Sequence, residues 1–296
     1  MAKIIDGKKT AAEIRVEIAA DVKKLKRRKI YPGLAVVLVG NDPASEVYTH
    51  MKKKTCADLG IASFDYDLPK NTTEKRLLKL IDTLNADKKV HGILVQLPLP
   101  KQINEAKILN AIDPSKDVDG FHPVSVGKML NGEETFLPCT PNGCKELLMR
   151  YGCDPAGKHV VIVGRSNIVG KPMAAILMQK AEGANATVTV CHSSTKNLSK
   201  ITQQADIVIA AIGVPNFIKA RMVKQGVVVI DVGVNRVADK TRKSGYRLVG
   251  DVDFKNVSKK AKAITPVPGG VGPMTITMLM KNTVESARRH GPAGKK

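Results

Sequence analysis

The sequence predicts an α/β protein made of two domains, each built on a parallel β-sheet. Strand-like and helix-like segments alternate along most of the chain, which is typical of parallel strands joined by crossover helices. Near residue 164 a strand runs directly into a glycine turn and a helix, and the alternation then continues as it does in nucleotide-binding domains. The length of 296 residues also fits two domains of ordinary size.

The first half of the chain contains the elements of the first domain. In chain order we expect a helix at about 11–25, a strand at 33–40, a helix at 45–59, a strand at 61–68, a helix at 73–84 and a strand at 90–97. Ser45 is expected to cap its helix and Gly60 to end it. The strand at 90–97 is apolar enough to be covered on both faces, apart from Gln96 near its carboxyl end.

One predicted helix carries an aromatic ring and an amine on the same face, because Tyr48 and Lys52 are four residues apart. Such a pair can position a flat ligand and move a proton on it. Gln96 is expected at the carboxyl edge of the sheet, where open α/β sheets bind ligands. Two plainer interpretations stay open. The three lysines at 52–54 are a solvated face, or Gln96 only caps the backbone before the prolines that follow it.

Two carboxylates, Asp117 and Asp119, are separated by one residue in the segment 113–120. They suggest hydrogen bonding to a ligand or a metal site, and a plain turn is the alternative. We expect no metal, because no further histidine or carboxylate stands at a ligand spacing. The five cysteines contain no Cys-x-x-Cys pair, which predicts reduced, mostly buried thiols and neither a disulfide framework nor a zinc site.

The charge is unusual, since 48 Lys and Arg against 27 Asp and Glu give a net +21. This favours anionic partners such as nucleic acid, a membrane surface or small molecules rich in phosphate and carboxylate. Aromatic residues make up only 3% of the chain and no nucleic-acid motif is present. No apolar run approaches the roughly 20 residues of a membrane span, and the N-terminus lacks a signal-peptide core. We therefore expect a cytoplasmic protein with no membrane or nucleic-acid partner.

The second half begins a new series of elements. We expect a helix at about 142–151, strands at 158–163, 187–191, 206–210 and 227–231, and a final helix at 275–289. The turn from Gly164 to Gly170 joins the first of these strands to an apolar helix. Backbone N–H groups and the helix dipole there would cradle a phosphate. Because the glycine spacing differs from the usual dinucleotide fingerprint, the prediction depends on the surrounding strand and helix.

The residues after the second strand of this half favour NADP over NAD. An NAD site places an acid at that point to bind the ribose hydroxyl, whereas residues 190–195 read Val-Cys-His-Ser-Ser-Thr. Arg165 in the glycine turn can reach the same point and bind a 2′-phosphate. The Pro/Gly-rich loop at 265–275 would let its backbone approach a ligand closely, or it would act as a hinge between domains.

Six motifs in unbroken order resemble those of one family. They are Tyr-x-x-x-Lys at 48–52, Val-Gln-Leu-Pro-Leu-Pro at 95–100, Lys-Asp-Val-Asp-Gly at 116–120, Pro-Cys-Thr-Pro at 138–141, Gly-Arg-Ser-x-Ile-Val-Gly-x-Pro at 164–172 and Pro-Gly-Gly-Val-Gly-Pro-Met-Thr at 268–275. Over nearly its whole length the chain resembles the bifunctional methylenetetrahydrofolate dehydrogenase/methenyltetrahydrofolate cyclohydrolases. The stand-alone form is expected, without a formyltetrahydrofolate synthetase extension.

The resemblance implies a reaction and four catalytic roles. NADP-dependent oxidation of 5,10-methylenetetrahydrofolate would give the methenyl cation, and its hydrolysis would give 10-formyltetrahydrofolate. Lys52 would be the general acid and base of the hydrolysis, with Gln96 tuning that amine. Tyr48 would stack on the folate and Asp119 would hold its pterin ring.

The resemblance also implies binding residues and a domain arrangement. The folate would be contacted by Val95, Leu97, Pro268, Gly269, Gly270, Val271 and Gly272. The dinucleotide would be held by Gly164, Arg165, Ser166, Ile168, Ser193, Ser194, Gly213, Val234 and Thr275. A folate domain of residues 1–143, completed by the C-terminal helix 275–296, would face an NADP domain of residues 144–274 across the active-site cleft. A homodimer, polyglutamylated folate as a partner and a place in purine biosynthesis are further expectations.

The chemistry requires a lysine that is neutral near physiological pH. Hydride loss leaves a cation, so the oxidation needs orientation more than a base, but water attack on that cation needs a proton acceptor. Burial, the neighbouring Lys53 and Lys54, and the cationic ligand would each lower the pKa of Lys52, and Gln96 is an uncharged partner for it. Two alternatives remain: a monofunctional dehydrogenase, and a nucleic-acid-binding protein suggested by charge alone.

Overall fold

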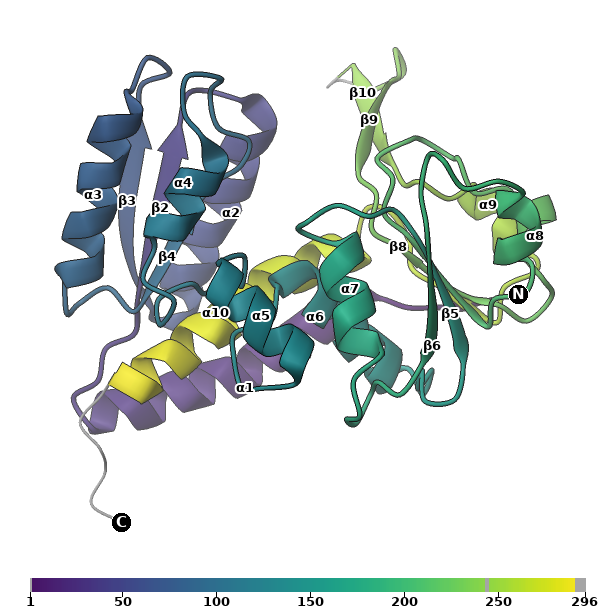
Figure 1. The fold of residues 1–296 in the computed structure, drawn as a ribbon, viewed down its shortest axis with the longest axis horizontal. Coiled ribbons are helices and arrows are strands. Elements are labelled where there is room, and N and C mark those ends of the chain that lie inside the picture. Colours follow the sequence, from purple (N-terminus) through teal and green to yellow (C-terminus); the bar gives the residue numbers. More distant parts are fainter. Residues whose placement is uncertain (1, 243–244, 291–296) are drawn as a thin grey trace. The chain divides into compact units, whose positions relative to one another are not determined.

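The computed structural model describes residues 2–242 and 245–290, and the chain folds into two compact units. One comprises Met1–Ala12 and Thr140–Thr275, and the other comprises Glu13–Cys139 and Ile276–Lys296. We call them the six-stranded unit and the three-stranded unit, after the main parallel sheet that each contains within the described residues. The predicted α/β fold with two parallel-sheet domains is confirmed (Figure 1).

The three-stranded unit contains a parallel sheet in the order β3–β2–β4. Its strands are β2 (Gly33–Val39), β3 (Ala62–Leu68) and β4 (Gly92–Val95). Every residue of β2 is buried, as expected of a central strand covered on both faces. The helices α3 (Glu74–Ala86) and α4 (Glu105–Ala111) cover one face, and α2 (Pro43–Leu59) lies on the other side in Figure 1. This packing directs the carboxyl ends of β2 and β4 to one edge of the sheet.

The six-stranded unit contains a parallel sheet in the order β1–β11–β8–β7–β5–β6 over the described residues. Its strands are β1 (Lys3–Ile4), β5 (His159–Val163), β6 (Thr187–Cys191), β7 (Ile207–Ala210), β8 (Val228–Asp231) and β11 (Ala263–Ile264). The chain passes from β5 to β6 on one side and then returns to place β7 on the other side of β5. The strand order therefore reverses at β5, and the carboxyl ends of β5 and β7 form a topological switch point, where such sheets bind ligands.

Helices complete the two units. They are α1 (Gly7–Arg27), α5 (Pro123–Asn131), α6 (Cys139–Arg150), α7 (Gly170–Leu177), α8 (Leu198–Thr202), the 3₁₀ helix η1 (Ala220–Met222), α9 (Phe254–Val257) and α10 (Val271–His290). In Figure 1, α7 lies on one side of the six-stranded sheet and α8 and α9 lie on the other. An antiparallel hairpin of β9 (Asn235–Ala238) and β10 (Tyr246–Val249), absent from the prediction, follows β8.

The first residues of the chain differ from the predicted domain division. Residues 1–143 are expected in one domain from the sequence, whereas Met1–Ala12 belong to the six-stranded unit. The reason is that β1 pairs in parallel with β11, a strand nearly 260 residues later (Lys3 opposite Ala263). A two-residue edge strand has no hydrophobic period of its own, so its partner is not visible in the sequence.

The observed ends of two helices and one strand correct the predictions. The cap of α2 is Asp42 and not Ser45, because the Asp42 carboxylate accepts a hydrogen bond from the Ser45 N–H at 2.8 Å and Pro43 occupies the first turn. The end at Gly60, with φ 71°, is confirmed. The helix α10 begins at Val271, earlier than predicted, since glycine and proline are tolerated in a first turn whose N–H groups have no helical partners. The strand β4 ends at Val95, shortly before a proline that cannot donate to the ladder.

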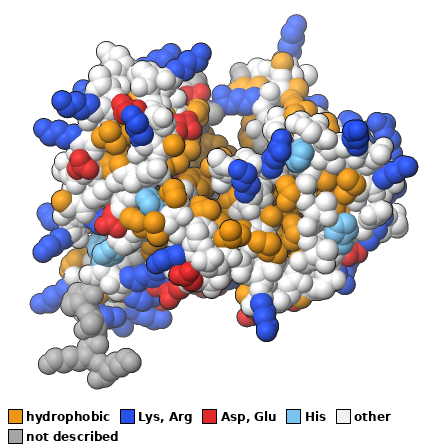
Figure 2. All heavy atoms as spheres, viewed as in Figure 1, with side chains coloured by type: hydrophobic (Ala, Val, Ile, Leu, Met, Phe, Trp, Pro, Cys, Tyr) orange, Lys and Arg blue, Asp and Glu red, His pale blue; other side chains and the backbone are white. Residues whose placement is uncertain are grey.

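The cysteines, the basic side chains and the membrane-span prediction can be compared with the structure. All five cysteines are free and buried. On the face drawn in Figure 2, basic side chains are dispersed over both units rather than gathered into one stripe. Among the helices that the structure describes, none combines the length and the apolar character needed to cross a bilayer.

Candidate active site

Lys52 and Gln96 meet at the carboxyl edge of the three-stranded sheet. Lys52 lies on α2 and is only 7% exposed, and its Nζ donates a hydrogen bond to Gln96 Oε1 at 2.8 Å. Gln96 follows β4, where its own N–H donates to the Val37 carbonyl at 2.9 Å. Its Nε2 donates to the Leu97 carbonyl at 2.7 Å, which leaves Oε1 to face the amine. The solvated-face interpretation of the lysine run is therefore wrong for Lys52.

The charged residues of the segment 116–120 have different partners. Lys116 donates to three backbone carbonyls at the end of α3, those of Leu84, Asn85 and Asp87. The Asp117 carboxylate accepts from the Phe121 and His122 N–H groups and from the Ser125 hydroxyl. Asp119 instead interacts electrostatically with Lys52. Residue spacing could not distinguish these carboxylates, although the family resemblance singled out Asp119.

Burial is the largest influence on the pKa of the Lys52 amine. It lowers the pKa of the amine below the ordinary lysine value, while Asp119 and, less strongly, Cys139 raise it in part. The expected contribution of the neighbouring lysines is not found, since Lys53 forms an ion pair with Asp67 at 3.1 Å. The hydrogen-bond partner of the amine is an uncharged amide, as predicted, but a carboxylate also acts on it. The arrangement favours an amine that exchanges protons more readily than an exposed lysine.

Cys139 belongs to this centre and was missed by the sequence analysis. Its side chain is 2% exposed and its Sγ donates to the Val118 carbonyl at 3.4 Å. Burial, followed by the charge of Asp119 and a hydrogen bond with it, raises the pKa of the Cys139 thiol well above the usual range. Burial also raises the pKa of Asp119, and Lys52 opposes that effect. The Pro-Cys-Thr-Pro motif was the available signal, but the cysteines were considered only as buried thiols.

The other predicted residues of the three-stranded unit lie near this edge in different environments. Tyr48 is half-buried one helical turn before Lys52, and burial raises the pKa of its phenol. Leu97 is half-buried directly after Gln96. Val95 is 4% exposed and packs into the core beneath α3 and α4. Of these side chains, Tyr48 and Leu97 retain surface for a ligand, whereas Val95 supports the strand.

The predicted dinucleotide residues lie at the carboxyl ends of successive strands of the six-stranded sheet. Gly164, Arg165, Ser166 and Ile168 follow β5, Ser193 and Ser194 follow β6, Gly213 follows β7 and Val234 follows β8. Because all these strands are parallel, the residues share one edge of the sheet. Thr275 lies apart from them on α10, where its hydroxyl is 2.9 Å from the Thr140 hydroxyl.

The turn at the switch point is shaped by glycine. Gly164 has φ 130°, and a Cβ there would lie 2.1 Å from the Ala211 carbonyl oxygen beyond β7. A Cβ on Gly170, at the start of α7, would lie 2.2 Å from the Gly164 carbonyl oxygen. The Ser166 hydroxyl accepts from the Val169 N–H at 3.1 Å. Backbone therefore surrounds the turn on both sides, while the side chain of Arg165 is exposed.

Two buried aspartates that the sequence analysis missed hold the neighbouring loops. Asp251 accepts from the Ile212 and Gly213 N–H groups at 2.6 and 2.9 Å. Asp231, at the end of β8, accepts from the Asp251 and Val252 N–H groups, both at 2.9 Å. Burial raises the pKa of Asp231 to about 7. These carboxylates fix the loop after β7, which carries the predicted cofactor residue Gly213.

Pro268, Gly269 and Gly270 end the loop that connects β11 to α10 within the six-stranded unit, and Val271 and Gly272 begin α10. Gly269 has φ 105°, and a Cβ on Gly270 would lie 2.6 Å from the Pro266 carbonyl oxygen. A Cβ on Gly7, in α1, would lie 1.8 Å from the Gly270 carbonyl oxygen. The loop is thus held against the start of α1, and Gly270 is required by close backbone contact whereas Gly269 is required by its positive φ.

Comparison with known proteins identifies the family to which this fold and this site belong. The tetrahydrofolate dehydrogenase/cyclohydrolase catalytic domain matches residues 5–119, and the NAD(P)-binding domain of the same family matches residues 138–291. The chain belongs to the tetrahydrofolate dehydrogenase/cyclohydrolase family. The bifunctional protein FolD of Geotalea daltonii is 61% identical over 289 residues, which cover 98% of this chain and 100% of that protein. The FolD of Acetivibrio thermocellus is 56% identical over 97% of each chain.

Solved structures of the tetrahydrofolate dehydrogenase/cyclohydrolase family share the fold. The Campylobacter jejuni FolD structure has a TM-score of 0.92 at 52% identity, covering 98% of this chain and 99% of that one. The Trypanosoma brucei structure, described as complexed with NADP cofactor and inhibitor, has a TM-score of 0.92 at 41% identity over 97% and 98% of the chains. The chain is a bifunctional dehydrogenase and cyclohydrolase, and the monofunctional alternative is not favoured.

The six-stranded unit fits the dinucleotide that this family uses. Added side-chain atoms would collide with backbone at Gly164 and Gly170, so the two ends of the turn at the switch point carry no side chain, which suits close approach of a phosphate to the main chain there. The residues after β6, from His192 to Ser194, include no acid that would repel a 2′-phosphate. The residues present therefore fit a dinucleotide with a phosphorylated ribose.

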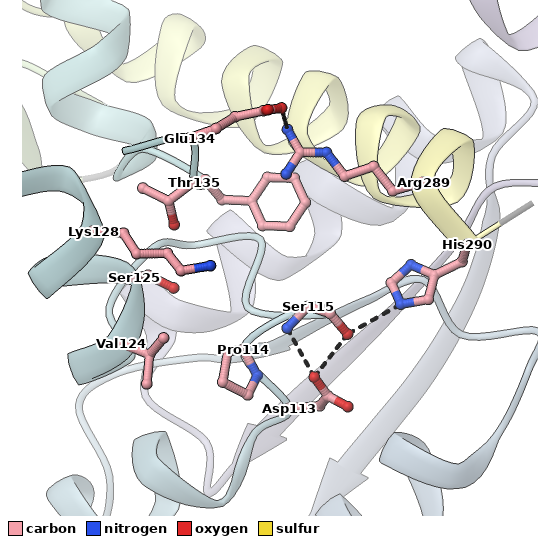
Figure 3. A pocket seen from close by; sticks show the side chains of 11 residues that line it. Asp113, Pro114, Ser115, Val124, Ser125, Lys128, Glu134, Thr135, Arg289 and His290 are labelled. Atoms are coloured by element: carbon pink, nitrogen blue, oxygen red, sulfur yellow. Dashed lines mark hydrogen bonds and ion pairs between the residues drawn. The ribbon is translucent and has the colours of Figure 1, made fainter. Parts of the chain in front are cut away.

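A separate cavity of about 450 Å³ lies elsewhere on the three-stranded unit of this family member (Figure 3). It is lined by the segment 113–115, part of α5 and the end of α10, where Ser115 Oγ is 3.0 Å from His290 Nε2. The neighbouring Ser286 binds the carbonyl of His91, just before β4, whereas Gln96 follows β4. Five residues of extended chain separate the two points by about 16 Å, so this cavity is distinct from the Lys52 centre.

Proposed function

We propose that this chain oxidises 5,10-methylenetetrahydrofolate with NADP to the methenyl cation and hydrolyses that cation to 10-formyltetrahydrofolate, with Lys52 moving the protons of the second step. The observation that carries the assignment is the buried Lys52 amine, which is hydrogen-bonded to a neutral amide and has a lowered pKa. The three-stranded unit then serves as the folate domain and the six-stranded unit as the NADP domain.

In the hydrolysis, Lys52 acts first as a base and then as an acid. Water attacks the cationic methenyl carbon, a C–O bond forms, and the proton released from the water passes to the Lys52 amine. The bond from that carbon to N5 of the folate then breaks while the hydroxyl becomes a carbonyl. N5 takes up one proton, so the net reaction consumes one water and releases one proton. A lowered amine pKa suits both transfers, because each needs a group that both accepts and gives up a proton readily.

The neighbouring residues orient the reactants and adjust the amine. Gln96 fixes the direction of the Lys52 Nζ through its Oε1. The carboxylate of Asp119, which acts electrostatically on Lys52, stabilises the positive charge that Lys52 gains. By the family resemblance, the same carboxylate binds the polar edge of the pterin. Tyr48 stacks on the folate from the preceding turn of α2. NADP, when bound, supplies the acceptor for the hydride, and Gly164, Arg165, Ser166, Ile168, Ser193, Ser194, Gly213, Val234 and Thr275 are the residues proposed to hold it.

The preference for NADP is supported by the end of β6. The residues Cys191 to Ser194 include no carboxylate, and the exposed Arg165 follows the adjacent strand β5. A cation with nearby hydroxyls binds a 2′-phosphate, whereas an acid would bind the free hydroxyl of NAD. The related Trypanosoma brucei enzyme is described with NADP bound.

The finer biological setting is proposed from the family resemblance and the charge. We place the enzyme in the cytoplasm, as a homodimer that supplies one-carbon units for purine biosynthesis, and sedimentation of the purified chain tests the dimer. The net charge of +21 would attract the anionic tails of folate polyglutamates. A steeper salt dependence of KM for polyglutamylated than for monoglutamylated folate tests that attraction.

The absorbance of the methenyl intermediate tests the two-step function. Purified enzyme given methylenetetrahydrofolate and NADP should reduce NADP while the methenyl absorbance stays low, because the second step removes the cation. A monofunctional dehydrogenase would instead let the cation accumulate in proportion to the NADPH formed, apart from its slow uncatalysed hydrolysis. Methenyltetrahydrofolate supplied directly should decay faster with the enzyme, in the absence of NADP, than it does without the enzyme.

A further inference from the structure

An asparagine on α10 ties together the two segments that carry Asp119 and Cys139. Asn282 is 8% exposed, and its Nδ2 donates to the Val118 carbonyl at 2.8 Å and to the Leu137 carbonyl at 3.1 Å. The same nitrogen is 3.8 Å from Cys139 Sγ. One side-chain amide therefore binds the residue before Asp119 and a residue two positions before Cys139.

The two segments are in close contact at the point that Asn282 holds. Gly120 has φ 71°, and a Cβ there would lie 2.6 Å from the Phe136 carbonyl oxygen and 2.7 Å from the Pro138 nitrogen. The Cys139 thiol reaches the Val118 carbonyl, which is also the nearer acceptor of Asn282. The position of Asp119 is thus fixed by its packing against 136–138 and by the amide of Asn282.

Asn282 itself does not interact directly with the reacting groups. Its two carbonyl partners are backbone atoms, its one side-chain partner is the Cys139 thiol, and no hydrogen bond joins it to Lys52 or Gln96 among the described residues. Without its two donors, the Val118 carbonyl would keep only the weaker thiol bond, and the segment 118–119 would be free to shift. Displacements of about 1 Å in a catalytic group can lower a rate by about 100-fold.

We infer that Asn282 is a positioning residue of the cyclohydrolase, which holds the Val118 and Leu137 carbonyls so that the Asp119 carboxylate stays beside the Lys52 amine. This inference rests on the proposed role of Asp119 in the hydrolysis. It gives α10 a function in the reaction although the side chain concerned lies outside the reacting centre.

The test compares four proteins in the hydrolysis of methenyltetrahydrofolate: the wild type, Asn282→Leu, Asp119→Asn and the double variant. Leucine is branched at Cγ as asparagine is, but it is larger and has no donor. We expect Asn282→Leu to lower kcat at least tenfold, to raise KM for the folate by a smaller factor because Asp119 is also proposed to bind the pterin, and to shift the pH profile of kcat. If Asn282 acts through Asp119, adding Asn282→Leu to Asp119→Asn should cause no further loss.

A matched control is Ser286→Ala, one turn further along α10. The Ser286 hydroxyl is also buried and binds two backbone carbonyls, those of His91 and Ser115, at the other end of β4. The Ser286→Ala variant should lower the melting temperature about as much as Asn282→Leu does, while leaving kcat and its pH profile unchanged. Should Asn282→Leu fail to fold, Asn282→Ser, which keeps one donor, takes its place. Asn282→Gln, which keeps both donors, should recover part of the rate.

The outcomes separate this inference from the proposed function. A large effect of Asp119→Asn with no effect of Asn282→Leu overturns the inference and leaves the role of Asp119 intact. The same loss from Asn282→Leu in both backgrounds, or an equal loss from Ser286→Ala, also overturns it, since the effect would then be general destabilisation. A harmless Asp119→Asn removes the proposed role of Asp119, and the inference with it.

Discussion

The centre around Lys52 and the turn from Gly164 to Gly170 are built in opposite ways. The first consists of side chains: a buried amine, an amide and a carboxylate that alter one another's protonation. The second consists of backbone, with positions where even a methyl group would collide with a carbonyl. The first region changes the proton affinity of the Lys52 amine, and the second lets a ligand approach the main chain closely.

This difference follows from the chemistry that each region supports. Proton transfer needs a titratable group whose pKa is adjusted, and only a side chain supplies one. Binding a pyrophosphate needs several N–H groups at short range, which the backbone supplies if side chains are absent. The first region should therefore be damaged by removing atoms, and the second by adding them.

Removing the amine should have the largest effect. We expect Lys52→Met to lower the cyclohydrolase kcat by at least about 100-fold, since the variant keeps the length of the side chain but cannot transfer protons. Folate binding should be largely retained. The measurement is the decay of methenyl absorbance with the cation supplied directly.

Lys116→Met is the matched control for this prediction. Lys116 is 6% exposed, about as buried as Lys52, but its amine binds three carbonyls at the end of α3. This variant should lose stability and keep its hydrolysis rate per folded molecule. Retained hydrolysis in Lys52→Met would remove Lys52 from the mechanism.

Adding one carbon to the turn should have the next largest effect. In Gly170→Ala the new Cβ meets the Gly164 carbonyl oxygen at 2.2 Å, so the turn must move away from α7. We expect KM for NADP to rise about tenfold, while hydrolysis of supplied methenyltetrahydrofolate, which needs no dinucleotide, stays near the wild-type rate. Gly127→Ala is the control, since a Cβ at Gly127 meets nothing within 4 Å. Equal losses of both activities in Gly170→Ala would contradict the separation of the two regions.

The smallest effect concerns the one exposed cation assigned to the cofactor. Arg165→Ala should raise KM for NADP several-fold and leave KM for NAD nearly unchanged, because only NADP carries the 2′-phosphate that the guanidinium would bind. Lys171→Ala, which removes a cation whose amine binds Asn167 at 2.7 Å, should affect neither selectively. Similar changes in both Michaelis constants for Arg165→Ala would refute the assignment.

The two regions were also unequal in what the sequence revealed. Tyr48 and Lys52 share a helix face by spacing alone, and Gln96 stands out as polar in an apolar strand, so their meeting was predictable. Spacing did not separate Asp117 from Asp119, because their partners depend on which way a turn directs each carboxylate; only the family resemblance singled out Asp119. Cys139 joined the centre only through folding, since its partners lie about 20 residues earlier.

In the six-stranded unit, the strands and the glycine turn were predictable from periodicity and from glycine itself. Asp231 and Asp251 were not, although they hold the loop that carries Gly213. Their partners are backbone N–H groups, which every residue has, so no residue pattern marks such contacts. The pairing of β1 with β11 escaped prediction for a similar reason.

The crowded turn at the switch point also limits how the coenzyme choice of this enzyme can be redesigned. No side chain can be introduced at Gly164 or Gly170 without displacing the main chain. The exposed serines after β6 have no such restriction, and an engineer seeking an NAD-dependent variant would start there, with an acidic residue. Natural selection faces the same restriction, so drift in coenzyme use among relatives should be confined to that one loop and to Arg165.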